Sequence, residues 1–140
     1  MTHENPHDTS PFNELLGIRL TEWRHGYAAA EIEVKPSLMN RTGFLHGGVL
    51  CTLLDTVCSR AGCWSPSERR IRSSTVSLTI NFSRATQVGV LTARGTLRPG
   101  AGSSIFSATG EVLDIEGRLV ALAQGTFKYR PGNTPKDALA

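Results

Sequence analysis

The sequence of 140 residues contains no long apolar run and few charged residues. Hydrophobic residues make up 39% of the chain and charged residues 19%, a balance that indicates one globular domain and excludes a largely disordered chain. No apolar segment approaches the roughly 18 residues that a membrane span requires. The first eleven residues lack the basic and apolar segments of a secretion signal. We therefore expect a cytoplasmic protein without a membrane partner.

Cysteine is also scarce, and its positions match no metal or disulfide pattern. Cys51, Cys58 and Cys63 are an odd number of cysteines, and no two of them form a C-x-x-C pair. Neither a disulfide framework nor a zinc site is therefore expected, and free thiols in the protein interior are the simpler interpretation. We expect no bound metal.

Acidic residues are rare in the middle of the chain, although the net charge is only +3. Between Lys35 and Gly110, nine basic residues stand against two acidic ones, Asp55 and Glu68. This excess would suit an anionic or phosphate-bearing small molecule, or it reflects a composition biased toward arginine. No aromatic residues are interleaved with these arginines as platforms for base stacking, so we do not expect a nucleic-acid partner.

Prolines and polar residues mark both ends of the chain. Residues 1–10 and 131–140 are interpreted as flexible tails on either side of one domain at 11–130. The domain opens with a short helical segment, PFNELLG, and a predicted β-hairpin formed by residues 18–23 and 27–34.

The second half of the domain is rich in β-type residues. From Thr75 to Phe82, apolar and polar residues alternate as in a half-buried strand, with Val76 among the apolar ones. Three further β-type segments, separated by turns at Pro99-Gly100 and Ile115-Glu116-Gly117, predict an antiparallel meander: 89–98, 103–114 and 118–130.

Residues 46–64 have the periodicity of one amphipathic helix. Its apolar face would contain Val49, Leu50, Leu53, Leu54, Val57, Ala61 and Trp64. The opposite face carries mostly small residues: Gly48, Cys51, Asp55, Cys58, Ser59 and Gly62. A solvated face would normally carry Lys, Glu and Arg, so this face is expected to be buried or to contact a partner. An α+β fold follows, in which this helix covers one face of an antiparallel sheet.

The start of this helix and its single carboxylate are the candidates for chemistry. A helix that begins near His46 presents unpaired N–H groups at its first turn. Glycines at 47 and 48 would let a substrate carbonyl oxygen approach these N–H groups. Alternatively, the glycines only allow the helix start to pack closely against the sheet. Asp55 is the only carboxylate between Glu33 and Glu68. A carboxylate in such a position is either a hydrogen-bonded structural group or a working base or nucleophile.

The spacing N-x5-HGG-x6-D, from Asn40 to Asp55, with Thr75 opening TVSLTINF, closely resembles the phenylacetate-pathway type of hotdog-fold acyl-CoA thioesterase. The resemblance extends from about Phe12 to Tyr129. It implies a hotdog fold, an antiparallel sheet wrapped around one long central helix. It also implies hydrolysis of an aryl- or medium-chain acyl-CoA to the acid and CoA, with no cofactor beyond the CoA of the substrate.

The resemblance assigns roles to five residues by position. Gly47 would donate its N–H to the oxyanion, and Asp55 would be the nucleophile or general base. Asn40 would orient the thioester or the attacking water, Thr75 would assist Asp55, and His46 would support the loop.

Further residues are candidates for contacts with the CoA part of the substrate. They are Gly48, Arg69, Arg70, Arg72, Arg84, Arg98, Gly100, Ser103 and Ser104. The family often ends the strand before Arg84 with F-x-R-P-A, whereas this chain has FSRAT, which leaves the nucleotide contacts open.

Helix geometry adds an independent expectation. Gly47 and Asp55 are eight residues apart, or about 12 Å along a helix axis, too far for both to reach one carbonyl. The site would then be shared between two copies of the chain in a homodimer or a dimer of dimers. Two alternatives remain: a non-catalytic acyl-CoA sensor and a hotdog-fold hydratase or dehydratase. The hydratase normally uses a catalytic His with a second acidic residue, and no such pair is evident here.

Overall fold

The computed structural model describes residues 9–67 and 69–136. Parts of the two expected tails, residues 1–8 and 137–140, therefore lie outside the described residues, as does Glu68. The elements follow in the order α1 (Pro11–Leu16), β1 (Arg19–Arg24), β2 (Tyr27–Glu33), a 3-10 turn (Pro36–Leu38), α2 (Gly47–Ala61), β3 (Ser73–Phe82), β4 (Val90–Leu97), β5 (Ile105–Leu113) and β6 (Leu119–Tyr129).

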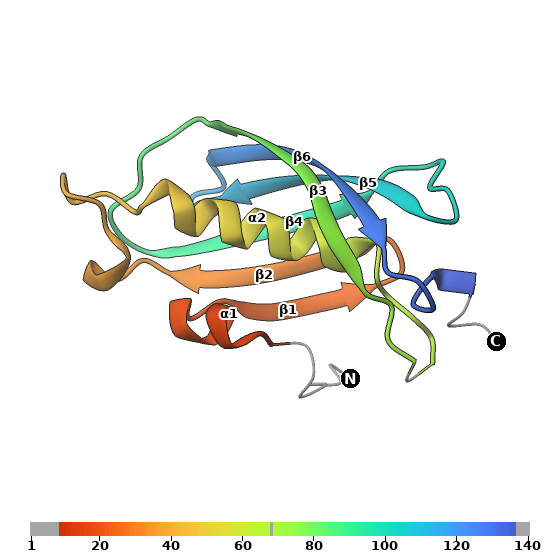
Figure 1. Ribbon diagram of the computed structural model, residues 1–140. Coiled ribbons are helices and arrows are strands. Elements are labelled where there is room, and N and C mark those ends of the chain that lie inside the picture. Colours follow the sequence, from red (N-terminus) through yellow and green to blue (C-terminus); the bar gives the residue numbers. More distant parts are fainter. Residues whose placement is uncertain (1–8, 68, 137–140) are drawn as a thin grey trace.

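The strands form one antiparallel sheet in the order β1-β2-β4-β5-β6-β3, which curves around α2 (Figure 1). This arrangement confirms the predicted α+β fold, and the hairpin and the meander are present as expected. Nothing in the pattern of residues showed that β3 pairs with β6 at the far edge of the sheet. No helix in the described part of the chain is long and apolar enough to cross a bilayer.

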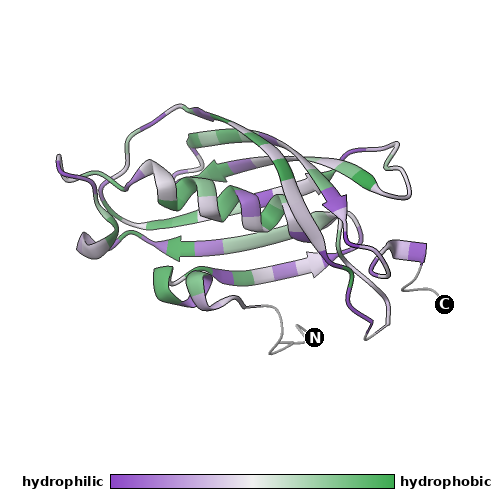
Figure 2. Cartoon of the chain, viewed as in Figure 1, coloured by the Kyte–Doolittle hydropathy of each residue, from purple (hydrophilic) through white to green (hydrophobic). Residues whose placement is uncertain are grey.

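α2 packs on the sheet through its apolar face, along which the colouring of Figure 2 marks hydrophobic residues. Leu53, Leu54 and Val57 have no exposed surface. Strand glycines make this close packing possible. A Cβ at Gly95 would lie 2.2 Å from the Val57 carbonyl oxygen, and one at Gly110 would lie 2.8 Å from Cys58 Sγ.

One expectation for α2 is corrected. The helix ends at Ala61 with Gly62 as its C-cap, so Trp64 lies beyond the helix. On the face of small residues, Cys58 and Gly62 are buried against the inner face of the sheet, which agrees with the expectation that this face is buried or contacts a partner. Cys58 packs with Phe106 and Phe127 in a second core cluster. The rest of the small-residue face, including Asp55, is half-buried or exposed.

A bulge divides β3. The register with β6 shifts between Thr75 and Ser77, which leaves Val76 without a partner. Because a bulge reverses the alternation of side chains, Thr75 lies on the same face as Leu78 and Ile80, which pack against the core. Val76 is 60% exposed, so its predicted place on the inner face is wrong.

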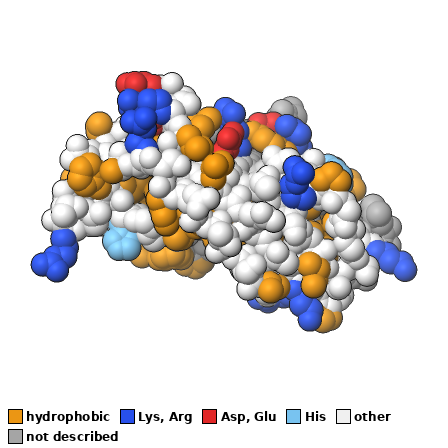
Figure 3. Space-filling view, turned by 90° about the horizontal axis from the view of Figure 1, so that it is seen from above, with side chains coloured by type: hydrophobic (Ala, Val, Ile, Leu, Met, Phe, Trp, Pro, Cys, Tyr) orange, Lys and Arg blue, Asp and Glu red, His pale blue; other side chains and the backbone are white. Residues whose placement is uncertain are grey.

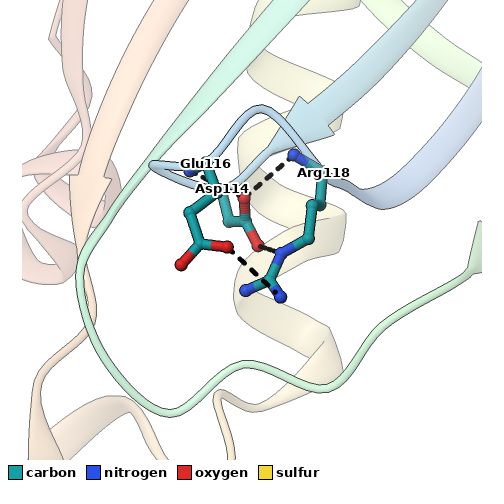
Figure 4. A network of polar contacts seen from close by, with 3 residues as sticks. All are labelled: Asp114, Glu116 and Arg118. Carbon is teal, nitrogen blue, oxygen red and sulfur yellow. Dashed lines mark hydrogen bonds and ion pairs between the residues drawn. The ribbon is translucent and has the colours of Figure 1, made fainter.

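The turn between β5 and β6 is fixed by one carboxylate (Figure 4). Asp114 Oδ1 accepts hydrogen bonds from the N–H groups of Glu116 and Arg118, at 3.0 and 2.9 Å, and Oδ2 accepts one from Arg118 Nε at 2.8 Å. Burial alone would raise the pKa of Asp114, but these bonds and the nearby guanidinium hold it below its ordinary value.

Candidate active site

In the first turn of α2, one N–H group finds no acceptor in the part of the chain that the structure describes. His46 is the N-cap: its Nδ1 accepts from the Gly48 N–H at 2.8 Å, and its carbonyl oxygen accepts from the Val49 N–H at 3.0 Å. Among the described residues, none accepts a hydrogen bond from the Gly47 N–H. This N–H lies at the positive end of the α2 dipole and is positioned to bind an oxyanion.

The two glycines at the start of α2 have different surroundings. A Cβ at Gly48 would lie 2.9 Å from His46 Nδ1 and would disturb the cap. A Cβ at Gly47 would lie 3.4 Å from the Phe82 ring, which is an ordinary contact. Gly48 is therefore needed for the cap, whereas the space around Gly47 would accept a methyl group. Phe82, at the end of β3, is a neighbour of Gly47 that the sequence did not indicate.

Asn40 organises the loop before α2. Its Oδ1 accepts from the Thr42 N–H at 3.0 Å, the Thr42 hydroxyl at 2.9 Å and the Phe44 N–H at 3.1 Å. Two backbone donors on one atom identify that atom as the oxygen. The Asn40 amide nitrogen is thus left to face solvent as a donor, which suits contact with a carbonyl oxygen or a water.

Asp55 lies near the middle of α2 and is half-buried. Its Oδ1 accepts a hydrogen bond of 2.7 Å from the Thr75 hydroxyl. The bulge at Val76 is what turns Thr75 toward the helix, because strict alternation would place it on the outer face of the sheet. The pair joins the middle of α2 to the start of β3.

Cys58 and Cys63 are poorly suited to act as nucleophiles. Burial, and to a smaller extent the charge of Asp55, raises the pKa of the Cys58 thiol to about 12. Burial also raises the pKa of Cys63, although a hydrogen bond with Ser73 and the charge of Arg60 act in the opposite direction. Both thiols stay protonated at neutral pH, and a protonated thiol is a weak nucleophile. Asp55 is a better candidate than either of these two thiols.

The other expected site residues lie at opposite ends of α2. Arg84 follows β3, and a hydrogen bond from the Leu45 N–H to the Thr86 carbonyl oxygen joins this connection to the loop before α2. Arg98, Gly100, Ser103 and Ser104 belong to the connection between β4 and β5. Tyr129 ties that connection to the C-terminal end of α2: its N–H donates to the Ser104 carbonyl oxygen, and its hydroxyl donates to the Gly62 carbonyl oxygen.

One chain therefore does not bring all the candidates together. Gly47 and Asp55 are both on α2, about 12 Å apart along its axis. The Lys and Arg side chains on the face seen in Figure 3 lie in several separate places rather than in one patch. Among the described residues, no three His, Cys, Asp or Glu side chains gather as metal ligands would.

The family profile described as "Thioesterase superfamily" matches residues 42–121, more than half of the chain. The chain belongs to this superfamily. In this thioesterase-superfamily member, Gly47, Asp55 and Thr75 lie within the matched range, and Asn40 lies two residues before the range begins.

Solved structures of similar proteins have the same architecture as this thioesterase-superfamily chain. A conserved protein of Pseudomonas aeruginosa is 28% identical and superposes with a TM-score of 0.83, over 91% of this chain and 99% of that protein. A thioesterase of Haemophilus influenzae is 25% identical, with a TM-score of 0.80, over 90% of this chain and 87% of that protein.

Sequence relatives of this superfamily member are named as esterases. A protein of Archaeoglobus fulgidus named "Putative esterase" is 29% identical over 117 residues, which are 84% of this chain and 73% of that protein. A Mycobacterium tuberculosis protein, also named as a "Putative esterase", is 40% identical over 53 residues. That match spans 38% of its length and 38% of this chain.

Proposed function

We propose that this chain hydrolyses acyl-CoA thioesters to a carboxylic acid and free CoA. The observation that carries the proposal is the presence on α2 of two groups that thioester hydrolysis needs. One is the Gly47 N–H at the start of the helix, which has no acceptor among the described residues. The other is the Asp55 carboxylate on the same helix, which accepts a hydrogen bond from Thr75. Membership of the thioesterase superfamily supports the same class of enzyme.

In the proposed reaction, the thioester carbonyl oxygen accepts a hydrogen bond from the Gly47 N–H. As the carbonyl carbon is attacked, this N–H stabilises the negative charge on the oxygen. Asp55 either attacks the carbon itself or takes a proton from the attacking water. The C–S bond breaks, the sulfur leaves as CoA thiol after gaining one proton, and water supplies the hydroxyl of the acid. The Asn40 amide nitrogen would orient the thioester or the water.

We propose that each site is completed by a second copy of the chain. β3 pairs with β6 on one side, and its other edge pairs with no strand in the described ranges. An edge strand of ten residues is a ready template for pairing with another strand, and Val76 and Phe82 are exposed on it.

The positions of two β3 residues favour this model. Thr75 contacts Asp55, whereas Phe82 lies beside Gly47, seven residues further along the strand. If two β3 strands pair antiparallel about their midpoint, the Thr75 end of one lies beside the Phe82 end of the other. Asp55 of one chain is then carried toward Gly47 of its partner, and a two-fold axis creates two equal sites.

The CoA contacts and the acyl group belong to this proposal as well. Arg84 lies near the Gly47 end of α2, and Arg98 with the Gly100–Ser104 turn lies near the other end; both regions could bind phosphates. The acyl group would be aryl, as in the phenylacetate-pathway type that the sequence resembles, or of medium chain length. The competing function, a non-catalytic acyl-CoA sensor, would make no use of the Asp55–Thr75 pair.

The direct test measures the release of free thiol from a panel of acyl-CoA and acyl-carrier thioesters, with the Asp55→Asn variant as the control. The substituted amide keeps an oxygen that can accept from Thr75, so the fold should be retained, but an amide can neither attack nor accept a proton. We expect turnover by the wild type and almost none by the variant. Tight CoA binding without any turnover would favour the sensor, and near-normal turnover by Asp55→Asn would remove Asp55 from the chemistry.

A further inference from the structure

A pocket of about 300 Å³ lies at the end of the molecule where α2 stops, the right-hand end in Figure 1. Its lining comes from the β1–β2 turn, the end of α2 with the residues after it, the β4–β5 connection, and the end of β6 with the residues after it. None of the described lining residues is Asp, Glu, Lys or Arg. The pocket therefore favours an uncharged group, and its volume is at the lower end of the range for small-molecule sites.

Aromatic rings form part of this pocket. The Trp64 and His25 rings both line it and meet edge to face, with 6.0 Å between their centroids. Tyr129 lines it as well, and its hydroxyl donates to the Gly62 carbonyl oxygen at 2.8 Å. Trp64 is half-buried and His25 is exposed, so a ligand can reach both rings from solvent. Such rings stack with a nucleobase, because every base has a π face.

The connections at this end of the molecule are basic. They contain six basic residues and, among the described positions, no acidic one: Arg69, Arg70, Arg72, Arg98, Arg130 and Lys136. The connections at the other end are mixed, because Asp114 and Glu116 lie in the β5–β6 turn beside Arg118. The positive charge of the connections is therefore concentrated at the end that holds the pocket, which favours an anionic ligand there.

Three of these arginines each follow a lining residue directly in the chain: Arg72, Arg98 and Arg130. All three are exposed, and none forms an ion pair with a residue that the structure describes. The backbone holds two of them together, since the Arg130 N–H donates to the Arg72 carbonyl oxygen at 2.8 Å. Three guanidinium groups are therefore attached next to an uncharged aromatic pocket.

We infer that this end of the chain binds an adenine nucleotide, with the base in the pocket and the phosphates on the arginines. Adenine is flat, aromatic and uncharged at neutral pH, and guanidinium groups bind phosphate with two parallel hydrogen bonds. The described lining has no carboxylate to accept from the N–H groups that distinguish guanine. Two sources supply this chemistry: the adenosine 3′,5′-bisphosphate part of CoA and a free nucleotide. The first source rests on the proposed function, whereas the second does not.

The binding test is isothermal titration calorimetry of the full chain with adenosine 3′,5′-bisphosphate and with adenosine. Trp64→Leu removes a stacking ring and should weaken binding of both about 5- to 150-fold, the range for one stacked base. Arg98→Gln should weaken binding of the bisphosphate about fivefold, the upper end for an exposed ion pair, and leave adenosine unchanged. Arg94→Gln is the matched control, because Arg94 is exposed on the strand that leads to Arg98 and lies 3.8 Å from Glu111. It should bind both ligands as the wild type does.

The inference would be overturned if the bisphosphate did not bind at millimolar concentration, or if folded Trp64→Leu bound it as tightly as the wild type. Circular dichroism and Tm check the folding of this variant, because Trp64 is half-buried. If Trp64→Leu does not fold, His25→Ala changes the exposed ring of the same pair and should also weaken binding of both ligands. Unchanged affinity of His25→Ala would then overturn the inference.

Kinetic measurements distinguish the two sources of the nucleotide. If the site binds the CoA nucleotide, the bisphosphate competes with acyl-CoA, and Trp64→Leu raises KM for acyl-CoA but not for a phosphate-free pantetheine thioester. If the site binds a free nucleotide, the bisphosphate binds without competing with acyl-CoA. Calorimetry does not depend on turnover, so nucleotide binding by a chain that hydrolyses no thioester would refute the proposed function and leave this site standing. Thioester hydrolysis without nucleotide binding would refute the site and leave the proposed function standing.

Discussion

Replacing Gly47 with proline removes the proposed oxyanion donor with little disturbance of the helix. Gly47 is the first residue of α2, the position where proline is best tolerated because its missing N–H has no partner within the helix. Proline also restricts the residue before it to extended backbone, and His46 already has ψ of 133°. Because the Gly47 N–H has no acceptor among the described residues, no hydrogen bond within the described chain is lost.

The expected loss follows from the chemistry. Removing one oxyanion donor from a hydrolase lowers kcat by about 10²- to 10³-fold, or about 2.7 to 4 kcal/mol. Gly47→Ala is the control, because it keeps the N–H and its methyl group would lie 3.4 Å from the Phe82 ring. The assay is thiol release under saturating acyl-CoA, with circular dichroism and Tm to check folding. If folded Gly47→Pro and Gly47→Ala had the same kcat, the oxyanion role of Gly47 would be refuted.

Three further predictions follow from other contacts. Thr75→Val removes the hydrogen-bond donor to Asp55 and should lower kcat about 10- to 100-fold, since a hydrogen bond to a charged group is worth about 1.5 to 3 kcal/mol. Thr75→Ser keeps the hydroxyl and should retain most of the activity. Equal losses of kcat in the two variants would contradict the role of the Thr75 hydroxyl. KM for acyl-CoA should rise with salt concentration while kcat changes little, because salt screens contacts between arginines and the CoA phosphates. KM for a phosphate-free pantetheine thioester should not rise. If salt raised KM equally for both substrates, arginine–phosphate contacts would be contradicted. The pKa of Asp114 is lower in the folded protein than in the unfolded chain, where it is about 3.9. Ionised Asp114 therefore stabilises the fold at pH values above about 3.9, and this stabilisation is lost as the pH falls through the pKa of the folded state. The Tm of Asp114→Asn should therefore lie below that of the wild type at pH 7, and the gap should close in acid; a gap that widened would contradict the assignment.

Sequence reasoning succeeded where one period dominates a segment. The long helix was predicted because apolar residues recur on one side from Val49 to Ala61, and its end was missed because Gly62, a small residue, continues the pattern beyond the cap. The hairpin and the meander were found because β-type residues alternate with turn signals. Strand order is set by contacts between distant segments, so the pairing of β3 with β6 was not available from local patterns.

The candidate site shows the same division. The bulge at Val76 is the device that turns Thr75 toward Asp55, yet a bulge breaks the very alternation that identified the strand. The place of Thr75 beside Asp55 came only from the resemblance to a family. Likewise, the position of Phe82 beside Gly47 depends on how β3 crosses α2, which no local pattern encodes.

The central claim is that each site joins Gly47 of one chain to Asp55 of another. Gly47→Pro and Asp55→Asn proteins should each be almost inactive alone, and together they test the claim most directly. They are unfolded together and reassembled, so that random pairing makes about half of the dimers mixed. In each mixed dimer one site carries both changes and the other carries neither. The account predicts that thiol release recovers to roughly a quarter of the wild-type rate. No recovery, with mixed dimers shown by mass spectrometry, would contradict the shared site.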